Sequence, residues 1–246
     1  MVLPIKLNPD LDPSAAAHGF AEQGYAAVND VLVKPDARRL YKAASEWVEW
    51  NLVALIDGQH RDFIGAEMDR LEPARRAPFD QLVWREAQSG FGYLFENVPL
   101  YDAGMRDRLT QPLFKAAFEL TRSEAFIALG RKLTGDDAIT FADCQLTRYR
   151  PGHFLTRHDD GVEGKNRSAA FVLNLTPDWC ADYGGVLNLL DEQGDVRAGL
   201  TPAFNRLTLF KVPQPHLVSV ISPFARGARF AITGWFRRGE EPLLQG

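Results

Sequence analysis

Residues 149–160 read Tyr-Arg-Pro-Gly-His-Phe-Leu-Thr-Arg-His-Asp-Asp. The residues that follow the Pro-Gly turn predict a short strand over 154–158. Side chains two positions apart on a strand project from the same face. His158 and Asp160 can therefore reach a common point, while Asp159 faces away. An imidazole and a carboxylate suit Fe(II), and one distant histidine would complete a two-histidine, one-carboxylate site.

The sequence around this stretch predicts an α+β fold. Runs of β-branched and aromatic residues, separated by Gly, Pro, Asn and Asp, predict seven strands near residues 139–149, 154–158, 168–175, 185–190, 205–212, 215–221 and 228–237. Such a series is typical of a sandwich or jelly roll. The first half is mainly helical, with helices over 12–22, from Lys34 along a stripe that reaches Trp47 and Trp50, and twice within 105–134 about Ser123.

The change from a helical to a strand-like residue pattern divides the chain into three regions. Residues 1–137 form a mainly helical support region, 138–238 a β core, and 239–246 a tail. Within the first region, charge, Gly65, Pro73 and Pro78 weaken the helical pattern over 57–89, which predicts an extended connection or a lid.

Composition narrows the classes of function. The chain has 246 residues, a formal net charge of −4 and no basic block, so nucleic acid is not an expected partner. No secretory leader or long apolar run is visible, and we expect no membrane span. The two cysteines, Cys144 and Cys180, are expected to be reduced thiols in a cytoplasmic protein.

The second histidine ligand has to be chosen from four. A His-x-Asp match alone is weak, because about 0.4 such matches are expected by chance in this composition. His18 and His60 lie in the helical half, outside the expected barrel, and His153 sits at the turn beside Gly152. His216 starts an apolar strand, which makes it the favoured ligand, although a buried histidine is more often only part of a core.

One arginine downstream has the position of an anion clamp. Arg229 shares a strand face with the small residues Ala231 and Thr233, so its guanidinium can bind a carboxylate through two hydrogen bonds. Arg226 is expected to be a solvated surface residue.

These segments together resemble a known family. Residues 149–160 are similar to the first metal-ligand segment of prolyl 4-hydroxylase-type 2-oxoglutarate oxygenases. Residues 167–175 with Gly184-Gly185 resemble its central strands, and His216 followed by residues 227–229 and Gly234-Trp235 resembles its closing segment. The C-terminal layout is most similar to the ribosomal prolyl hydroxylase branch.

The resemblance implies a double-stranded β-helix with Fe(II) held by His158, Asp160 and His216. It also implies that Arg229 and Tyr149, with Thr233 beside them, bind 2-oxoglutarate. The implied reaction uses dioxygen, with ascorbate as the reductant, to hydroxylate a C–H bond of a protein or peptide, most simply a peptidyl proline.

Two departures and two alternatives stay open at this point. The family often carries Tyr where this chain has Asn174, and a polar residue where it has Val186, and both differences are expected to bear on the substrate. One alternative function is hydroxylation of a free amino acid or small metabolite. The other is a non-catalytic, metal-retaining β-barrel that binds a partner, which has no need of Arg229. Tyr149 has its own alternative, as a tyrosine that only packs beneath the turn.

Overall fold

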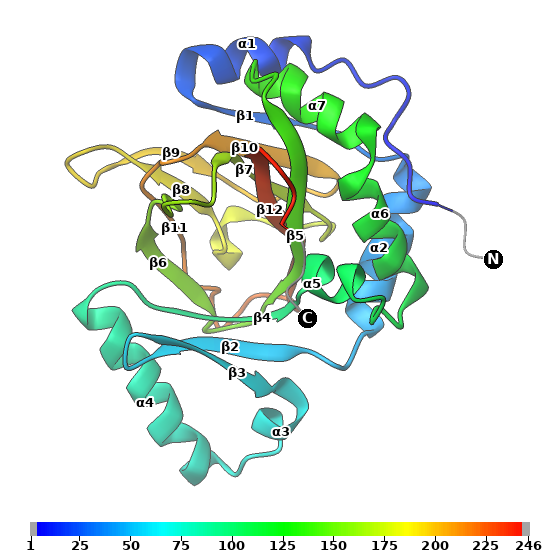
Figure 1. The fold of residues 1–246 in the computed structure, drawn as a ribbon. Coiled ribbons are helices and arrows are strands. Elements are labelled where there is room, and N and C mark those ends of the chain that lie inside the picture. The colour runs from blue at the N-terminus through cyan, green and yellow to red at the C-terminus, as the bar shows by residue number, and fades with distance from the viewer. Residues whose placement is uncertain (1–3, 243–246) are drawn as a thin grey trace.

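A curled antiparallel sheet forms the centre of the computed structural model, which describes residues 4–242 (Figure 1). In chain order the strands are β1 (Tyr25–Val28), β2 (Asn51–Ile56), β3 (Gln59–Ile64), β4 (Tyr93–Val98), β5 (Ile139–Tyr149), β6 (Phe154–His158), β7 (Arg167–Asn174), β8 (Leu187–Leu190), β9 (Val196–Leu200), β10 (Arg206–Lys211), β11 (His216–Val218) and β12 (Arg229–Arg238). The helices are α1 (Ser14–Gln23), α2 (Lys34–Glu46), α3 (Gly65–Asp69), α4 (Pro73–Ser89), α5 (Leu100–Met105), α6 (Pro112–Arg122) and α7 (Glu124–Thr134).

The strands form one continuous sheet that curls around an interior. Neighbours run β1-β10-β7-β12-β5-β4-β6-β11-β8-β9, and β2 pairs with both β4 and β3. The sheet curls so that β6, β11 and β8 face β7, β12 and β5 across the interior (Figure 1). This is the double-stranded β-helix expected from the sequence. The inward-facing side chains of the two halves of the sheet meet inside it.

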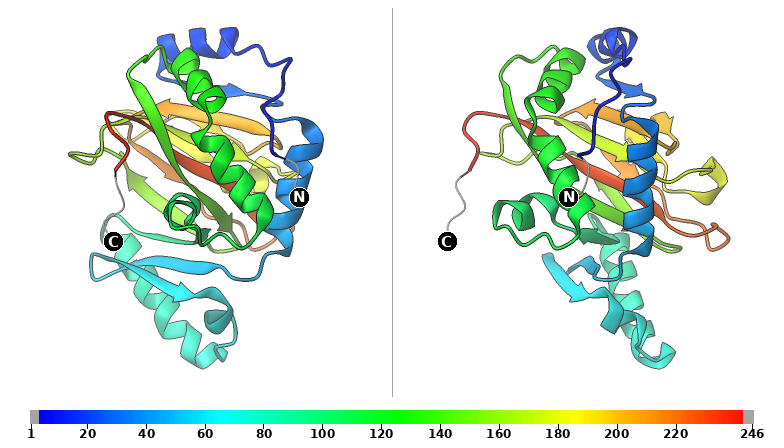
Figure 2. Two further views of the ribbon diagram at one scale, coloured as in Figure 1. Left: turned by 45° about the vertical axis from the view of Figure 1, so that its right-hand side comes forward. Right: turned by 90° about the vertical axis from the view of Figure 1, so that its right-hand side faces the viewer.

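Helices cover one outer face of the sheet (Figure 2). Helix α7 packs on it through Phe126, whose ring lies 5.3 Å from that of Phe171 and 5.2 Å from that of Phe236, measured between ring centroids. The interior of the helix approaches so closely at Gly130 that an added Cβ would lie 2.5 Å from the Phe236 ring. This contact fixes the position of β12 against the helical layer. It thereby also fixes the side chains on the inner face of that strand.

The expected strands of the C-terminal half are confirmed, most of them within two residues of their predicted ends. The strand expected to run to residue 221 is shorter and ends at Val218, and residues 222–224 lie in a loop. Ser123 caps α7 by accepting a hydrogen bond from the N–H of Phe126, and Gly24 and Gly135 end their helices in the left-handed conformation.

The prediction of an extended connection over residues 57–89 is wrong. The segment forms β3, α3 and α4. Pro73 does not prevent α4, because it occupies the first turn of that helix, where a missing N–H costs nothing. Helix α4 also continues through Pro78. Whether the segment acts as a lid stays a prediction.

Other differences concern the first half. Trp47 and Trp50 lie beyond α2, and Trp50 is buried just before β2, a strand that the sequence did not reveal. The strand β9 and the helix α5 were also not predicted. Strands β1 and β4 pair with β10 and with β5 and β6, so residues before 138 contribute to the same sheet.

Two simple expectations can be compared with the described residues. Cys144 is buried, Cys180 is exposed, and both are free thiols. Between residues 4 and 242, no helix combines the length and the apolar character needed to cross a bilayer.

The tight packing at Gly130 gives a test of the fold. Gly130→Ala is expected to lower the free energy of unfolding by about 1–3 kcal/mol, because the new methyl group must displace Phe236. Gly19→Ala, in α1, meets nothing within 4 Å and should be neutral or stabilising by up to about 1 kcal/mol. Urea unfolding of both variants measures this, and equal effects would contradict the packing described.

Candidate active site

The three predicted metal ligands come together on the inner wall of the barrel. Strand β11 pairs with β6 so that His216 lies opposite His158, and their ring centroids are 4.0 Å apart. Asp160 follows β6 with a positive φ of 62°, a conformation that Asp tolerates better than most residues. One potential ligand atom of each residue lies within 4.8 Å of the others.

Hydrogen bonds orient both imidazoles. The Nδ1 atom of His158 is 2.9 Å from the carbonyl oxygen of Thr156, and that of His216 is 2.8 Å from the carbonyl oxygen of Gln214. A carbonyl only accepts, so Nδ1 carries a proton in each ring, and in the neutral form of each ring the lone pair is on Nε2. The two Nε2 atoms lie 3.5 and 3.6 Å from the carboxylate of Asp160.

The charge states suit a cation at this point. Burial, together with the nearby His158, lowers the pKa of His216 to about 4, so this imidazole is neutral at pH 7. Burial opposes ionisation of Asp160, but the neighbouring His158 and His216 and the hydrogen bond from Trp235 outweigh it and lower the pKa of this carboxyl. Two neutral nitrogens and one carboxylate oxygen are a donor set that fits Fe(II).

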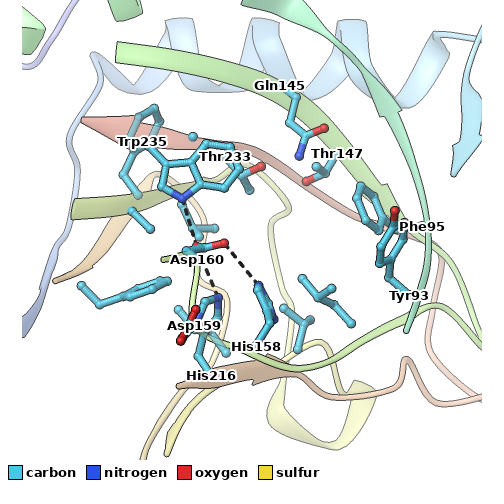
Figure 3. Close-up of a pocket in the computed structure, with 18 of the residues that line it drawn as sticks. Tyr93, Phe95, Gln145, Thr147, His158, Asp159, Asp160, His216, Thr233 and Trp235 are labelled. Atoms are coloured by element: carbon cyan, nitrogen blue, oxygen red, sulfur yellow. Dashed lines mark hydrogen bonds and ion pairs between the residues drawn. The ribbon is translucent and has the colours of Figure 1, made fainter. Parts of the chain in front are cut away.

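A second layer of side chains holds Asp160. The indole N–H of Trp235 donates to its Oδ2 at 3.0 Å (Figure 3). The guanidinium of Arg167 stacks 3.6 Å above the Trp235 ring and donates to the Asp160 carbonyl at 2.9 Å. Such contacts fix the direction of a ligating carboxylate. Neither residue was predicted as part of the site from the sequence, although Trp235 lies two positions beyond Thr233 on one strand.

A cavity of about 430 Å³ joins the triad to Arg229. Tyr149 and Thr233 also line it, and the guanidinium of Arg229 lies 5.5 Å from the centre of the Tyr149 ring. Arg229 is 4% exposed, and burial lowers its pKa to about 10. Its Nη2 donates to Oδ1 of Asn174 at 3.3 Å, but its Nε has no partner.

This arginine is suited to an anion from outside the protein. Within residues 4–242 no carboxylate pairs with it, and a buried charge is costly unless it is paired. The structure therefore brings Arg229 and Tyr149, which are paired across β12 and β5, to the cavity that holds the triad, and Thr233 lines the same cavity four positions further along β12.

Aromatic side chains form the opposite wall. Phe91, Tyr93, Phe95 and Tyr149 follow one another with ring centroids 5.5, 5.7 and 5.1 Å apart. Phe91, at the outer end, is 45% exposed and also contacts the ring of His158. Two of these four residues, Tyr93 and Phe95, belong to β4, in the N-terminal half.

The other residues singled out from the sequence fall in different places. The placement of His60 outside the barrel is wrong, because β3 brings it to the edge of this cavity. His153 is buried at the turn, apart from the triad, and Arg226 is exposed as expected. Asn174 contacts Arg229 and so bears on the anion end, whereas Val186 lies against Gly199 on β9.

Comparisons with known proteins agree with this geometry. Residues 144–237 match the family model described as the 2OG-Fe(II) oxygenase superfamily. The prolyl 3-hydroxylase OGFOD1 of Mus musculus is 34% identical over 120 residues, which are 46% of this chain and 22% of the relative. The Xenopus laevis protein of the same name is 33% identical over 100 residues, 38% of this chain and 19% of the relative. The chain therefore spans about a fifth of the length of these curated relatives.

Solved structures share the whole fold. A prolyl-4-hydroxylase from Pseudomonas putida superimposes with a TM-score of 0.59 at 19% identity, covering 93% of this chain and all of the other. The non-heme alpha ketoglutarate-dependent epimerase SnoN from nogalamycin biosynthesis superimposes with a TM-score of 0.56 at 13% identity, covering 96% and 95%. Residues 144–237, which include the three predicted metal ligands and Arg229, are thus similar to the 2OG-Fe(II) oxygenase superfamily, and this match covers less than half of the chain.

Proposed function

We propose that this protein is an Fe(II)- and 2-oxoglutarate-dependent dioxygenase that hydroxylates a prolyl residue of a protein or peptide. The observation that carries the proposal is the pairing of two features in one cavity. A metal-ligand triad lies on its wall, and a buried arginine without a carboxylate partner lies at its end. A barrel that only bound a metal would need the first feature and not the second.

His158, Asp160 and His216 would hold Fe(II), with the carboxylate directed by Trp235. When bound, the iron supplies the oxidative chemistry, in which dioxygen is activated while 2-oxoglutarate loses carbon dioxide. The protein's part is to place the ligands, orient both imidazoles and exclude water.

Arg229 would pair with the distal carboxylate of 2-oxoglutarate. Its Nε is unpartnered, and Asn174 holds Nη2 from the other side, so the fork is already oriented when the anion arrives. Tyr149, which is paired with Arg229 across β5 and β12, and Thr233, further along β12, also line the cavity. Ascorbate is the reductant we expect to restore Fe(II), and the expected location remains the cytoplasm.

The substrate assignment rests on the aromatic wall and on the relatives. A prolyl ring is a compact apolar group that packs well on aromatic faces, and Phe91, Tyr93 and Phe95 offer three beside His158. Proteins named as prolyl 3- and prolyl 4-hydroxylases are among those similar to this chain. The epimerase neighbour shows that the same fold also serves small molecules, so the substrate has to be tested directly.

The metal assignment is tested with two adjacent aspartates. Asp160→Asn removes the charge of the carboxylate without changing its size and is expected to lower the affinity for Mn(II), used as a stand-in for Fe(II), by about 100-fold or more. Asp159→Asn is the matched control, because Asp159 is exposed and its Oδ1 only accepts from the N–H of Gly161. Anaerobic calorimetry measures both, and unchanged affinity in Asp160→Asn would exclude this carboxylate as a ligand.

The 2-oxoglutarate assignment is tested with two arginines. Arg229→Ala should raise the 2-oxoglutarate concentration needed for half-maximal succinate formation by about 30-fold or more, because loss of one partner of a buried charge pair costs roughly 2–5 kcal/mol. Arg226→Ala, on the exposed loop, should change it less than about threefold. If both variants behaved alike, Arg229 would not be the anion-binding residue.

The substrate is tested with a randomised library of acetyl-Xaa-Xaa-Pro-Xaa-Xaa-amide peptides. With Fe(II), ascorbate and 2-oxoglutarate we expect some members to gain the mass of one oxygen atom on proline, together with formation of succinate. Amino-acid analysis then separates 3- from 4-hydroxyproline. Oxidation of free proline or another small acid, with no change in the library, would contradict the peptidyl assignment.

A further inference from the structure

Three polar side chains form a connected chain at the edge of the metal-side cavity. Nδ1 of His60 lies 2.7 Å from the hydroxyl oxygen of Tyr93, and its Nε2 lies 3.2 Å from Oδ2 of Asp62. His60 and Asp62 belong to β3, whereas Tyr93 belongs to β4, and these two strands are joined through β2. The contact therefore ties the outer hairpin to the wall of the cavity.

The neighbours of His60 decide which way these hydrogen bonds run. In a neutral imidazole one nitrogen donates and the other accepts. The Asp62 carboxylate favours the proton on Nε2, which leaves Nδ1 to accept from the hydroxyl of Tyr93. Burial raises the pKa of Tyr93 to about 12, so this hydroxyl keeps its proton at neutral pH.

Tyr93 consequently presents an acceptor to the cavity. Its hydrogen is directed to His60, and no other side chain or backbone group of the described residues donates to its oxygen. Tyr93 is 8% exposed and lines the cavity that holds the triad. Tyr93 and Phe95 lie across this cavity from Trp235 (Figure 3). A substrate N–H is the partner that this oxygen lacks.

The position of His60 indicates where a longer substrate would continue. A second cavity of about 570 Å³ adjoins the first, and His60, Asn97, Gln145 and Trp235 line both. A free amino acid needs only the metal-side cavity. A polypeptide needs a further space for the residues that flank its target, and the second cavity provides one beside Tyr93.

The chemistry of proline then selects the donor. A prolyl residue inside a chain has no N–H, so the N–H of the following residue is the nearest backbone donor on its C-terminal side. We propose that Tyr93, held by His60 and Asp62, positions the substrate by accepting this N–H, with the flanking residues passing His60 into the second cavity. The proposal rests on the proposed prolyl hydroxylase function and names how that site recognises a polypeptide.

The test uses the best peptide from the proline library and its ester analogue, in which the N–H after proline is replaced by oxygen. At pH 8 the wild-type protein is expected to use the ester with a kcat/KM at least about tenfold lower. Tyr93→Phe should lose a similar factor with the amide peptide and use both peptides equally well.

Tyr41→Phe is the matched control, because Tyr41 lies on α2 against Phe230, outside both cavities. It should retain the preference of the wild type for the amide. A wild-type protein that uses ester and amide equally overturns the proposal even if Tyr93→Phe does not fold, and so does a Tyr93→Phe protein that still prefers the amide. A library in which no proline is oxidised instead overturns the proposed function, so the two failures are distinguishable.

Discussion

The antiparallel pairing of β11 with β6 is the constraint on which this site depends. It places His216 opposite His158, although 57 residues of chain lie between them. The strand that achieves this, β11, has only three residues. β11 is held on its other side by β8, which sets its register at His216, Leu217 and Val218. A shift of one residue would turn His216 to the outer face. The metal site is therefore a consequence of sheet register rather than of local sequence.

Arg229 is held by the fold in a position that lowers the stability of the free protein. A fully buried guanidinium with an unpartnered Nε is unfavourable in the free protein, since the single hydrogen bond to Asn174 cannot replace its hydration. The same arrangement favours an anion that arrives with a carboxylate, because little reorganisation remains to be made. A group that is poorly satisfied without ligand, at the end of a cavity, is thus better explained by binding than by packing.

The sequence was informative where local pattern decides the structure. Alternation and turn residues predicted the C-terminal strands and brought His158, Asp160, His216 and Arg229 into one expected barrel. It was uninformative where tertiary pairing decides. β2 contains a short apolar run, Leu52–Ile56, which does not distinguish a strand from a helix. β3 is largely exposed, so His60 was placed outside the site. The prolines over 57–89 suggested irregular chain, although Pro73 begins a helix. Trp235 needed the position of Asp160 before its N–H had a visible partner.

The distribution of these residues along the chain divides the chemistry from its selectivity. The triad, Tyr149 and Arg229 all lie within the segment 144–237 that matches the superfamily. Phe91, Tyr93, Phe95 and the His60–Asp62 pair lie before it, on strands added to the same sheet. Proteins that share this fold include both a prolyl hydroxylase and an epimerase. Since the shared segment carries the residues proposed to bind the metal and the anion, differences in substrate are expected to arise in the walls that the N-terminal strands provide. In this chain those walls combine stacked aromatic rings with one oriented hydroxyl, which suits an apolar ring followed by a backbone N–H.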